Sequence, residues 1–414
     1  MIRTRLDRPL LVTVGLLLGF GILMVYSAGQ TDVPTPANGA WMRQLVWVVL
    51  ACVAGSVVFR LNFRIVEWAA PGIYALAIAL LVLTLVIGTG AGSAAGSKSW
   101  LAVGGYRLGQ PAELAKLATI LLLARYLSSL REAPQTLRQL VMPCLIVGAP
   151  FLLVMMQPDL GSAIVFIGIL FAMLFWAGVS PRLLLLLISP AVSLLLAAST
   201  AWWGAWMILL FALLVLWRPY VTEGVLIYLV NSAMGIVAIM IWTRVLKPYQ
   251  QQRLVSFLNP EADPVRSGYQ LIQSKVAIGS GGLLGNGFLD GPQKRLAFLP
   301  EQYTDFIFAV LGEELGFVGV AAALVLFFAL FLNLVRIARL ATDPFASLVV
   351  FGVLGLFFTH LFENIGMTIN VMPITGIPLP FFSYGGSFML SCGMAIALVL
   401  RVARDSRLSG YAEV

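Results

Sequence analysis

The sequence predicts an all-α polytopic membrane protein with about ten to twelve transmembrane helices. Of its 414 residues, 60% are hydrophobic and only 11% are charged, and the mean hydropathy is +0.96. Soluble domains carry roughly twice that fraction of charged residues. Long apolar runs follow one another through most of the chain, and one long polar interval, residues 244–304, interrupts them. We expect this interval to be a single long extracytoplasmic loop with short interfacial helices.

The apolar runs give the individual spans. A helix needs about 20 residues to cross the hydrocarbon layer. The runs at 112–127, 182–199 and 201–217 are short or closely spaced, so the count falls between ten and twelve. The candidate spans lie near residues 10–28, 41–59, 70–88, 112–127, 140–156, 160–178, 182–199, 201–217, 224–243, 305–335, 346–367 and 383–402.

Arginine in the short connections sets the predicted orientation, because such residues stay preferentially in the cytoplasm. With the N-terminus inside, only Arg43, Lys98 and Arg107 lie at short outer connections. Both termini are then cytoplasmic, and the 244–304 loop faces outward from the cytoplasmic (inner) membrane. The inner side receives Arg3, Arg5, Arg8, Arg60, Arg64, Arg125, Arg131, Arg138, Arg182, Arg218, Arg336, Arg339, Arg401, Arg404 and Arg407.

Composition also bounds the classes of function. The net charge of +8 comes from basic residues scattered between apolar spans, which does not indicate nucleic-acid binding. Residues 1–11 resemble a signal-peptide n-region, but without a convincing cleavage site after them we expect an uncleaved first helix. Cys52, Cys144 and Cys392 lie inside apolar segments, as small core residues do, and indicate neither a disulfide framework nor a metal site.

The stretch Phe257–Glu314 is the candidate working surface, since loops of this length are usually functional or disordered. Asp263 precedes Pro264 and is either a turn-capping carboxylate or a general base that accepts a proton from a substrate hydroxyl. Glycines between Gly279 and Gly291 form either a flexible re-entrant connection or a backbone anion site. The apolar residues before them, from Leu271 to Ile278, are compatible with a short interfacial helix.

Further ionisable residues lie at the ends of spans. Glu113 and Lys116 share one helical face at i and i+3, so they either lock helix packing as an ion pair or line a functional cavity. Asp159, in a Pro-Asp-Leu-Gly break, is a helix cap or a cavity residue. Asp305 suits a helix N-terminus, and at least one of two deeper carboxylates, Glu313 and Glu314, is expected to point to a polar interior.

The last motifs are near the C-terminus. Residues 376–387 hold two prolines and the pair Gly385-Gly386 within one re-entrant-looking turn, which membrane depth permits only under protein or water cover. His360 is the one histidine of the chain and is read as a satisfied packing residue on an apolar span. No nucleophilic triad and no His/Cys ligand set accompanies it.

Several of these motifs together resemble the SEDS family, the RodA and FtsW proteins of bacterial wall synthesis. The resemblance covers nearly the whole chain outside residues 180–245, and its most specific string runs from Leu299 through Thr304-Asp305-Phe306 to Ala309. Arg266 and Ala112 stand where the family has glycine and serine. The other matching pieces are Asp263-Pro264, Gly268-Tyr269-Gln270, Gln273-Ser274, Ala277 to Gly282, Gln110-Pro111 with Glu113 and Lys116, Gln157 to Gly161, Asn364 to Met367 and Gly376 to Ser387.

The resemblance implies ten helices in one membrane domain, 1–414. It divides into N-terminal helices (1–179), a region with a two-helix insertion (180–245), the extracytoplasmic loop (246–304) and C-terminal helices (305–414). The hairpin near 201–223, with tryptophans at its ends, is the expected insertion. A pair of added helices preserves the sidedness of everything after it.

The implied activity is an inverting peptidoglycan glycosyltransferase that polymerises lipid II, with undecaprenyl pyrophosphate as the leaving group. The resemblance makes Asp263 the base and Lys116 the contact for pyrophosphate. It implies no organic cofactor, but leaves a divalent cation (Mg²⁺ or Mn²⁺) open. The substrate-binding candidates are Glu113, Lys116, Asp159, Trp100, Arg107, Gln273, Ser274, Lys275, Thr304, Asp305 and Ser383.

Because the product lies outside the membrane and needs crosslinking, the resemblance implies a class B penicillin-binding protein as partner, beside other membrane proteins of the elongation complex. Gln293, the Phe298 to Glu301 run and Asn364 to Met367 favour the elongation (RodA) type, involved in cell shape, over the division (FtsW) type. A lipid II flippase would need polar groups on both sides of the membrane, and a scaffold would need none. The outer-side concentration of motifs favours outer-side chemistry.

Overall fold

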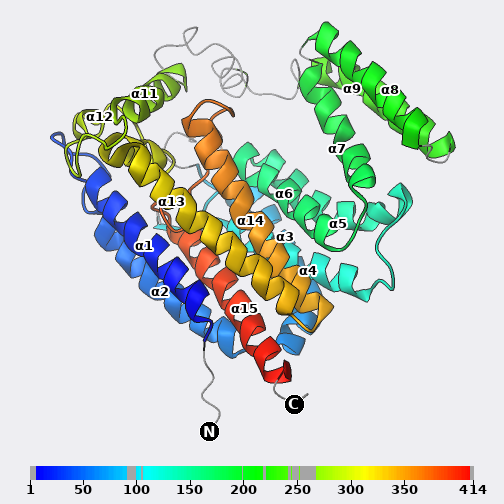
Figure 1. The fold of residues 1–414 in the computed structure, drawn as a ribbon, viewed down its shortest axis with the longest axis horizontal. Coiled ribbons are helices and arrows are strands. Elements are labelled where there is room, and N and C mark those ends of the chain that lie inside the picture. Colours follow the sequence, from blue (N-terminus) through cyan, green and yellow to red (C-terminus); the bar gives the residue numbers. More distant parts are fainter. Residues whose placement is uncertain are drawn as a thin grey trace.

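The computed structural model describes residues 6–90, 99–103, 106–197, 199–217, 221–240, 244, 251 and 267–410 (Figure 1). Each predicted apolar run is a helix. The long helices are α1 (Arg8–Ala28), α2 (Ala40–Arg60), α3 (Phe63–Ile87), α4 (Pro111–Ser129), α5 (Leu137–Met156), α6 (Leu160–Trp176), α7 (Pro181–Leu196), α8 (Thr200–Trp217), α9 (Val221–Met240), α13 (Ile307–Leu340), α14 (Pro344–Thr368) and α15 (Gly386–Gly410).

Within these ranges, 9 helices are long and apolar enough to cross a membrane, which confirms a multi-pass membrane protein. The helices α6 and α7 are apolar but shorter. The helix α4 is not in this group, and it carries three charged residues, Glu113, Lys116 and Arg125. Burying a charge inside a membrane helix costs free energy, and such charges usually face other protein groups. The helix α4 is therefore a candidate for carrying functional side chains.

Several helices begin where local chemistry predicts. Asp7 accepts a hydrogen bond from the Leu10 N–H at 3.1 Å, and Asp343 caps α14 in the same manner. A proline follows each cap within the first turn, where its missing N–H costs nothing. These caps fix the starts of α1 and α14 and satisfy backbone donors that would otherwise be unpaired.

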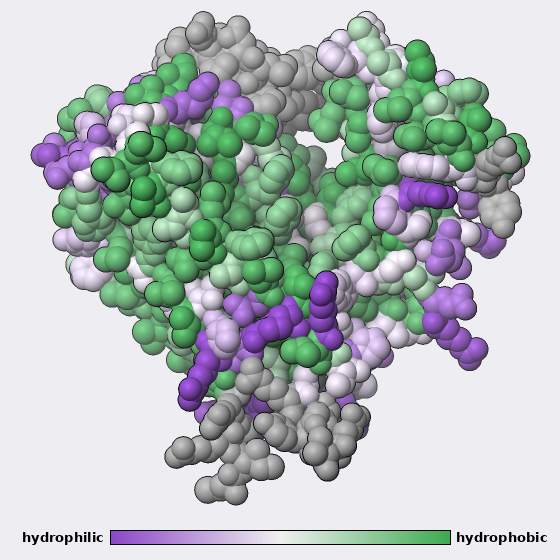
Figure 2. Space-filling view, in the orientation of Figure 1, coloured by the Kyte–Doolittle hydropathy of each residue, from purple (hydrophilic) through white to green (hydrophobic). Residues whose placement is uncertain are grey.

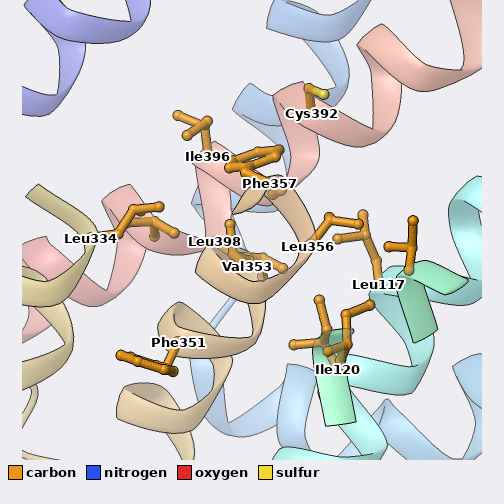
Figure 3. Packing of buried hydrophobic residues seen from close by; sticks show 14 of the residues in the cluster. Leu117, Ile120, Leu334, Phe351, Val353, Leu356, Phe357, Cys392, Ile396 and Leu398 are labelled. Atoms are coloured by element: carbon orange, nitrogen blue, oxygen red, sulfur yellow. The ribbon is translucent and has the colours of Figure 1, made fainter. Parts of the chain in front are cut away.

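The helix α14 is the centre of the bundle. Of its most apolar window, 72% is buried, and it packs against α4, α6, α13 and α15. Figure 3 shows Leu356 and Val353 of α14 beside Leu117 and Ile120 of α4. Because α14 is surrounded by protein, polar residues near its C-terminal end meet other side chains rather than lipid.

The helices α7, α8 and α9 form a separate group at one side of the molecule (Figure 1). They pack on one another around Leu186, Leu210, Leu214 and Ile227, and their main link to the bundle is the contact of α7 with α6. The predicted 201–223 hairpin therefore corresponds to α8, its connection and the start of α9.

The two ends of the bundle differ in composition. Both termini lie at one end, and α11 (Ser267–Ser280) and α12 (Pro292–Arg295) lie at the other (Figure 1). Hydrophilic residues gather near the termini and around the α12 end, and hydrophobic residues cover most of the face between (Figure 2). The start of α1 and the end of α15 therefore lie opposite α11 and α12.

One element was not predicted. The connection between α3 and α4 carries a short antiparallel pair, β1 (Leu101–Val103) and β2 (Tyr106–Gly109), with Ala102 opposite Arg107. Trp100 extends the pairing through a bridge to Thr89. Two short strands give a weak sequence signal next to long apolar runs, so the all-α prediction did not include them.

The glycine-rich run after α11 is docked into a break in α13. Gly316 has φ +59° and ψ −158°, so the helix is interrupted there. The Asn286 and Gly287 N–H groups donate to the freed carbonyls of Glu313 and Glu314, each at 3.0 Å. In return, the Phe317 N–H donates to the Gly282 carbonyl at 2.9 Å. The run is thus fixed by reciprocal hydrogen bonds, which differs from the flexible connection considered above.

Close packing explains why glycines occupy this contact. A Cβ on Gly281 would lie against the Gly312 carbonyl oxygen, and a Cβ on Gly285 would overlap the Glu314 carbonyl. Gly285 also has φ +81°, a left-handed conformation that side chains disfavour. The N–H groups of Asn286 and Gly287 are therefore already used within the fold, which argues against the anion-site alternative for those two groups.

Candidate active site

The first turn of α4 holds a buried ion pair. The Lys116 Nζ lies 2.7 Å from Glu113 Oε1, and the two side chains are 0% and 3% exposed. The structure confirms that the two residues share one face, as their i, i+3 spacing predicts. Ser391 of α15 donates to the Glu113 backbone carbonyl at 3.2 Å and ties this turn to the neighbouring helix.

His360 of α14 is the second partner of Lys116. Its Nε2 lies 3.0 Å from Lys116 Nζ, and its Nδ1 lies 3.1 Å from the Pro378 carbonyl oxygen. An ammonium only donates, and a proline carbonyl only accepts. Nε2 must therefore be the acceptor and Nδ1 must carry the proton, so the imidazole is neutral. Sequence analysis read His360 as a packing residue, and the structure adds a charged partner to that role.

Glu363 lies one helical turn after His360 and was missed by sequence analysis. It is 1% exposed, and its carboxylate lies beside the Thr375 side chain. The carboxylate interacts electrostatically with Lys116 and with Asp159. Its i, i+3 spacing from His360 was the available signal. We call Glu113, Lys116, His360 and Glu363 the Lys116 cluster.

Asp159 continues the polar region at the start of α6. Its Oδ1 accepts from the Ser162 N–H at 3.1 Å, so it caps the helix as the simpler alternative predicts. Its Oδ2 accepts from Gln110 Nε2 at 2.8 Å. The Gln110 N–H donates to Ser387 Oγ at 3.1 Å. Asp159 therefore combines the capping role with a connection to α4 and the C-terminal motif.

The predicted 376–387 motif lies mostly in the irregular segment between α14 and α15, residues 369–385, which is largely buried under protein. Asn364 Nδ2 donates to the carbonyls of Asp305 and Ile377, at 2.8 and 2.7 Å. Ser383 Oγ accepts from the Leu379 N–H and donates to the Thr304 carbonyl. Two adjacent predicted substrate residues, Thr304 and Asp305, are thus brought together with a third, Ser383, which is 79 positions after Thr304, beside the end of α14.

The residues just before α13 include Asp305, another carboxylate predicted to bind substrate. The Asp305 carboxylate lies near Gly376, and Tyr303 and Tyr384 pack with ring centroids 5.6 Å apart. Burial raises the pKa of the Tyr303 hydroxyl, and the Glu301 carboxylate adds to the shift. Tyr303 therefore keeps its proton at neutral pH and can act as a hydrogen-bond donor.

A second buried charge pair joins the loop to the bundle. Lys294 Nζ lies 2.8 Å from Glu314 Oε1, with both side chains fully buried, and Ser27 Oγ donates to the same carboxylate at 2.6 Å. Glu313 accepts from the N–H groups of Gln293 and Lys294 at the start of α12. Both deep carboxylates are therefore held in polar surroundings, as predicted for at least one of them.

The remaining predicted residues are dispersed. Ser274 of α11 is buried and donates to the Thr368 carbonyl at 2.8 Å, whereas Gln273 is half-buried and Lys275 is exposed. Trp100 is half-buried beside the strand pair. Asp263 and the Arg107 side chain lie outside the described residues.

The described residues do not favour a metal centre at the Lys116 cluster. Among them, no three His, Cys, Asp or Glu side chains are arranged to hold a metal ion. The Lys116 ammonium is paired with Glu113 and would repel a divalent cation at that carboxylate. No step below depends on a metal.

Comparison with known proteins identifies the family. The FtsW/RodA/SpoVE family model, described as cell cycle protein, matches residues 8–210 and 198–408. The chain is 36% identical to the peptidoglycan glycosyltransferase RodA of Treponema pallidum, over 96% of this chain and 97% of that one. It is 33% identical to a probable peptidoglycan glycosyltransferase FtsW of Geobacter metallireducens, over 98% and 96%.

Among solved structures, a chain of a peptidoglycan synthase complex described as coordinating polymerization and crosslinking superposes with a TM-score of 0.72. The sequence identity is 28%, and the match covers 97% of this chain and 98% of that one. The two segments of the family match overlap at residues 198–210. With matches that extend over nearly its whole length, the chain belongs to the FtsW/RodA/SpoVE family.

Proposed function

We propose that this chain polymerises lipid II into glycan strands at the outer face of the cytoplasmic membrane. As a member of its family, it is a peptidoglycan glycosyltransferase. The proposed substrate and reaction rest on the Lys116 cluster. It contains a fully buried ammonium that contacts His360, and His360 contacts Pro378 of the 369–385 segment. Charged groups at this depth are costly and usually mark a functional site.

The proposed reaction needs a base and a stabilised leaving group. The 4-hydroxyl of the acceptor sugar attacks the anomeric carbon of the growing chain, the hydroxyl proton passes to the Asp263 carboxylate, and undecaprenyl pyrophosphate leaves. Asp263 holds this role by resemblance. Lys116 is suited to the leaving group because a positioned ammonium in a dry site stabilises developing phosphate charge strongly.

Outer-side chemistry is favoured over transport by the distribution of buried charge. Glu113 and Lys116 lie in the first turns of α4, and His360 and Glu363 lie in the last turns of α14. These ends face the same side of the bundle as α11 and α12. A lipid II flippase needs polar groups through both halves of the membrane, and no comparable buried cluster is found in the opposite half of the described helices.

The partner and the cellular role are further proposals. The superposing structure is described as a complex that coordinates polymerization with crosslinking. We therefore expect a class B penicillin-binding protein as partner, both termini in the cytoplasm and the loop outside. Relatives of both RodA and FtsW name match at similar identity, and the motif preferences above favour a role in elongation.

The test is purified protein incubated with labelled lipid II, alone and with its transpeptidase partner. Lipid-linked glycan strands are the expected product. Transbilayer movement of labelled lipid II in proteoliposomes, without any strand formed, would instead support the flippase alternative.

A further inference from the structure

His360 stands out because the Lys116 ammonium depends on it for orientation. An ammonium has three N–H donors. One points to Glu113 Oε1 at 2.7 Å and a second to His360 Nε2 at 3.0 Å. The third has no hydrogen-bond partner among the residues that the structure describes. Two fixed donors determine where the third one points.

The imidazole is itself held rigidly on both sides. Its Nδ1–H donates to the Pro378 carbonyl at 3.1 Å, and its ring stacks on Phe388 with centroids 4.5 Å apart. Pro378 belongs to the re-entrant segment, and Phe388 belongs to α15. His360 therefore transmits the position of these two elements to a charge on α4.

A simple packing role does not account for this arrangement. A phenyl ring would fill the same space and stack on Phe388 equally well, with no polar atom to satisfy in a fully buried site. The neutral Nε2 instead offers an acceptor without a competing negative charge. A carboxylate in the place of His360 would add a second close anion to the one that Glu113 already supplies and would weaken the attraction of Lys116 for an anionic ligand.

We propose that His360 is a positioning residue for the reaction: it holds the Lys116 ammonium so that its free N–H meets the diphosphate of the lipid-linked substrate. This inference rests on the proposed function of Lys116 as the diphosphate contact. His360 itself touches neither the diphosphate nor the reacting carbon.

Two substitutions separate positioning from packing. His360→Phe keeps the ring and the stacking but removes the acceptor. His360→Gln loses the ring but retains an oxygen that can accept from Lys116. If His360 positions Lys116, His360→Phe lowers kcat and kcat/KM together by roughly tenfold to a hundredfold, the range for a lost bond to a charged group. His360→Gln should stay within about threefold of the natural chain.

The inference is overturned if the two activities rank the other way. Normal polymerisation of lipid II by His360→Phe, together with impaired polymerisation by His360→Gln, would mean that His360 only packs. Phe388→Leu is the matched control, since it weakens the stacking and leaves both hydrogen bonds of the imidazole in place. The Lys116→Met variant distinguishes the two proposals. If it retains full activity, the role assigned to Lys116 fails, whatever the His360 variants do.

A second measurement does not depend on activity or on a variant that folds. His360 is the one histidine in the sequence, so ¹⁵N-histidine labelling gives one imidazole spin system in the full chain. We expect a neutral ring with the proton on Nδ1 and a bare, hydrogen-bonded Nε2. A ring protonated on Nε2, or on both nitrogens, would show that it accepts nothing from Lys116 and would refute the proposal.

Discussion

The buried pair Glu113–Lys116 allows architecture to be separated from chemistry. Lys116→Met keeps the length of the side chain and removes its charge, and the Glu113 carboxylate is then left buried at 2% exposure. Breaking one side of a buried pair costs about 3–5 kcal/mol. We expect the single variant to lose roughly that much stability and most of its polymerisation activity.

The double variant Glu113→Gln, Lys116→Met removes both charges. Replacing a buried pair by neutral groups is often close to neutral for stability. The acceptor on His360 lacks its donor in both variants, so this loss does not distinguish them. The double variant should therefore be more stable than the single one by about 3–5 kcal/mol, the cost of the stranded Glu113 charge. If Lys116 contacts the diphosphate, activity should not return with stability.

Thermal unfolding in detergent and polymerisation of fluorescent lipid II, measured on the same preparations, provide the assay. The exposed pair Arg295–Asp32, with side chains 48% and 50% exposed, is a matched control. Arg295→Met should change stability by less than about 1 kcal/mol. Recovery of both stability and strand synthesis in the double variant would refute the reasoning and make the pair purely architectural.

Three further predictions concern the base, the orientation and the insertion. Asp263→Asn should give folded protein that binds lipid II but polymerises it about 10² to 10⁴-fold more slowly. Under the same conditions, Asp159→Asn should keep more activity. Near-normal strand synthesis by Asp263→Asn would end the assignment of Asp263 as the base. In a chain whose natural cysteines are replaced, Asn286→Cys should react with an impermeant thiol reagent from outside intact cells, and reaction only after permeabilisation would reverse the topology. Deleting α8 and α9 should preserve polymerisation because these helices pack mainly on each other and on α7; a folded but inactive deletion would show that the insertion takes part.

Local features of the site were predictable, and distant pairings were not. Glu113 and Lys116 were placed on one face by helical spacing alone, and Asp159 was recognised as a cap from its Pro-Asp-Leu-Gly context. His360 was assigned to packing because its partner is 244 positions away in the chain, beyond any local pattern. Glu363 was overlooked for the same reason.

The role of the glycine-rich run after α11 was likewise not predictable from local sequence. Its glycines were visible in the sequence, but their purpose depends on the break at Gly316, which no local pattern marks. A glycine inside an apolar helix is common in membranes. The run and the break are complementary only in three dimensions, where each satisfies the carbonyl and N–H groups that the other leaves free.

The irregular 369–385 segment explains why the buried Lys116 ammonium can persist near the end of α14. Backbone that leaves the helix at membrane depth must be covered by protein. Asn364 joins the 369–385 segment to the residues before α13, because it donates to the Ile377 carbonyl within the segment and to the Asp305 carbonyl. That same segment supplies the Pro378 carbonyl that orients His360, and His360 in turn orients Lys116. The first turns of α4 and the last turns of α14 are therefore coupled to the geometry of the 369–385 segment.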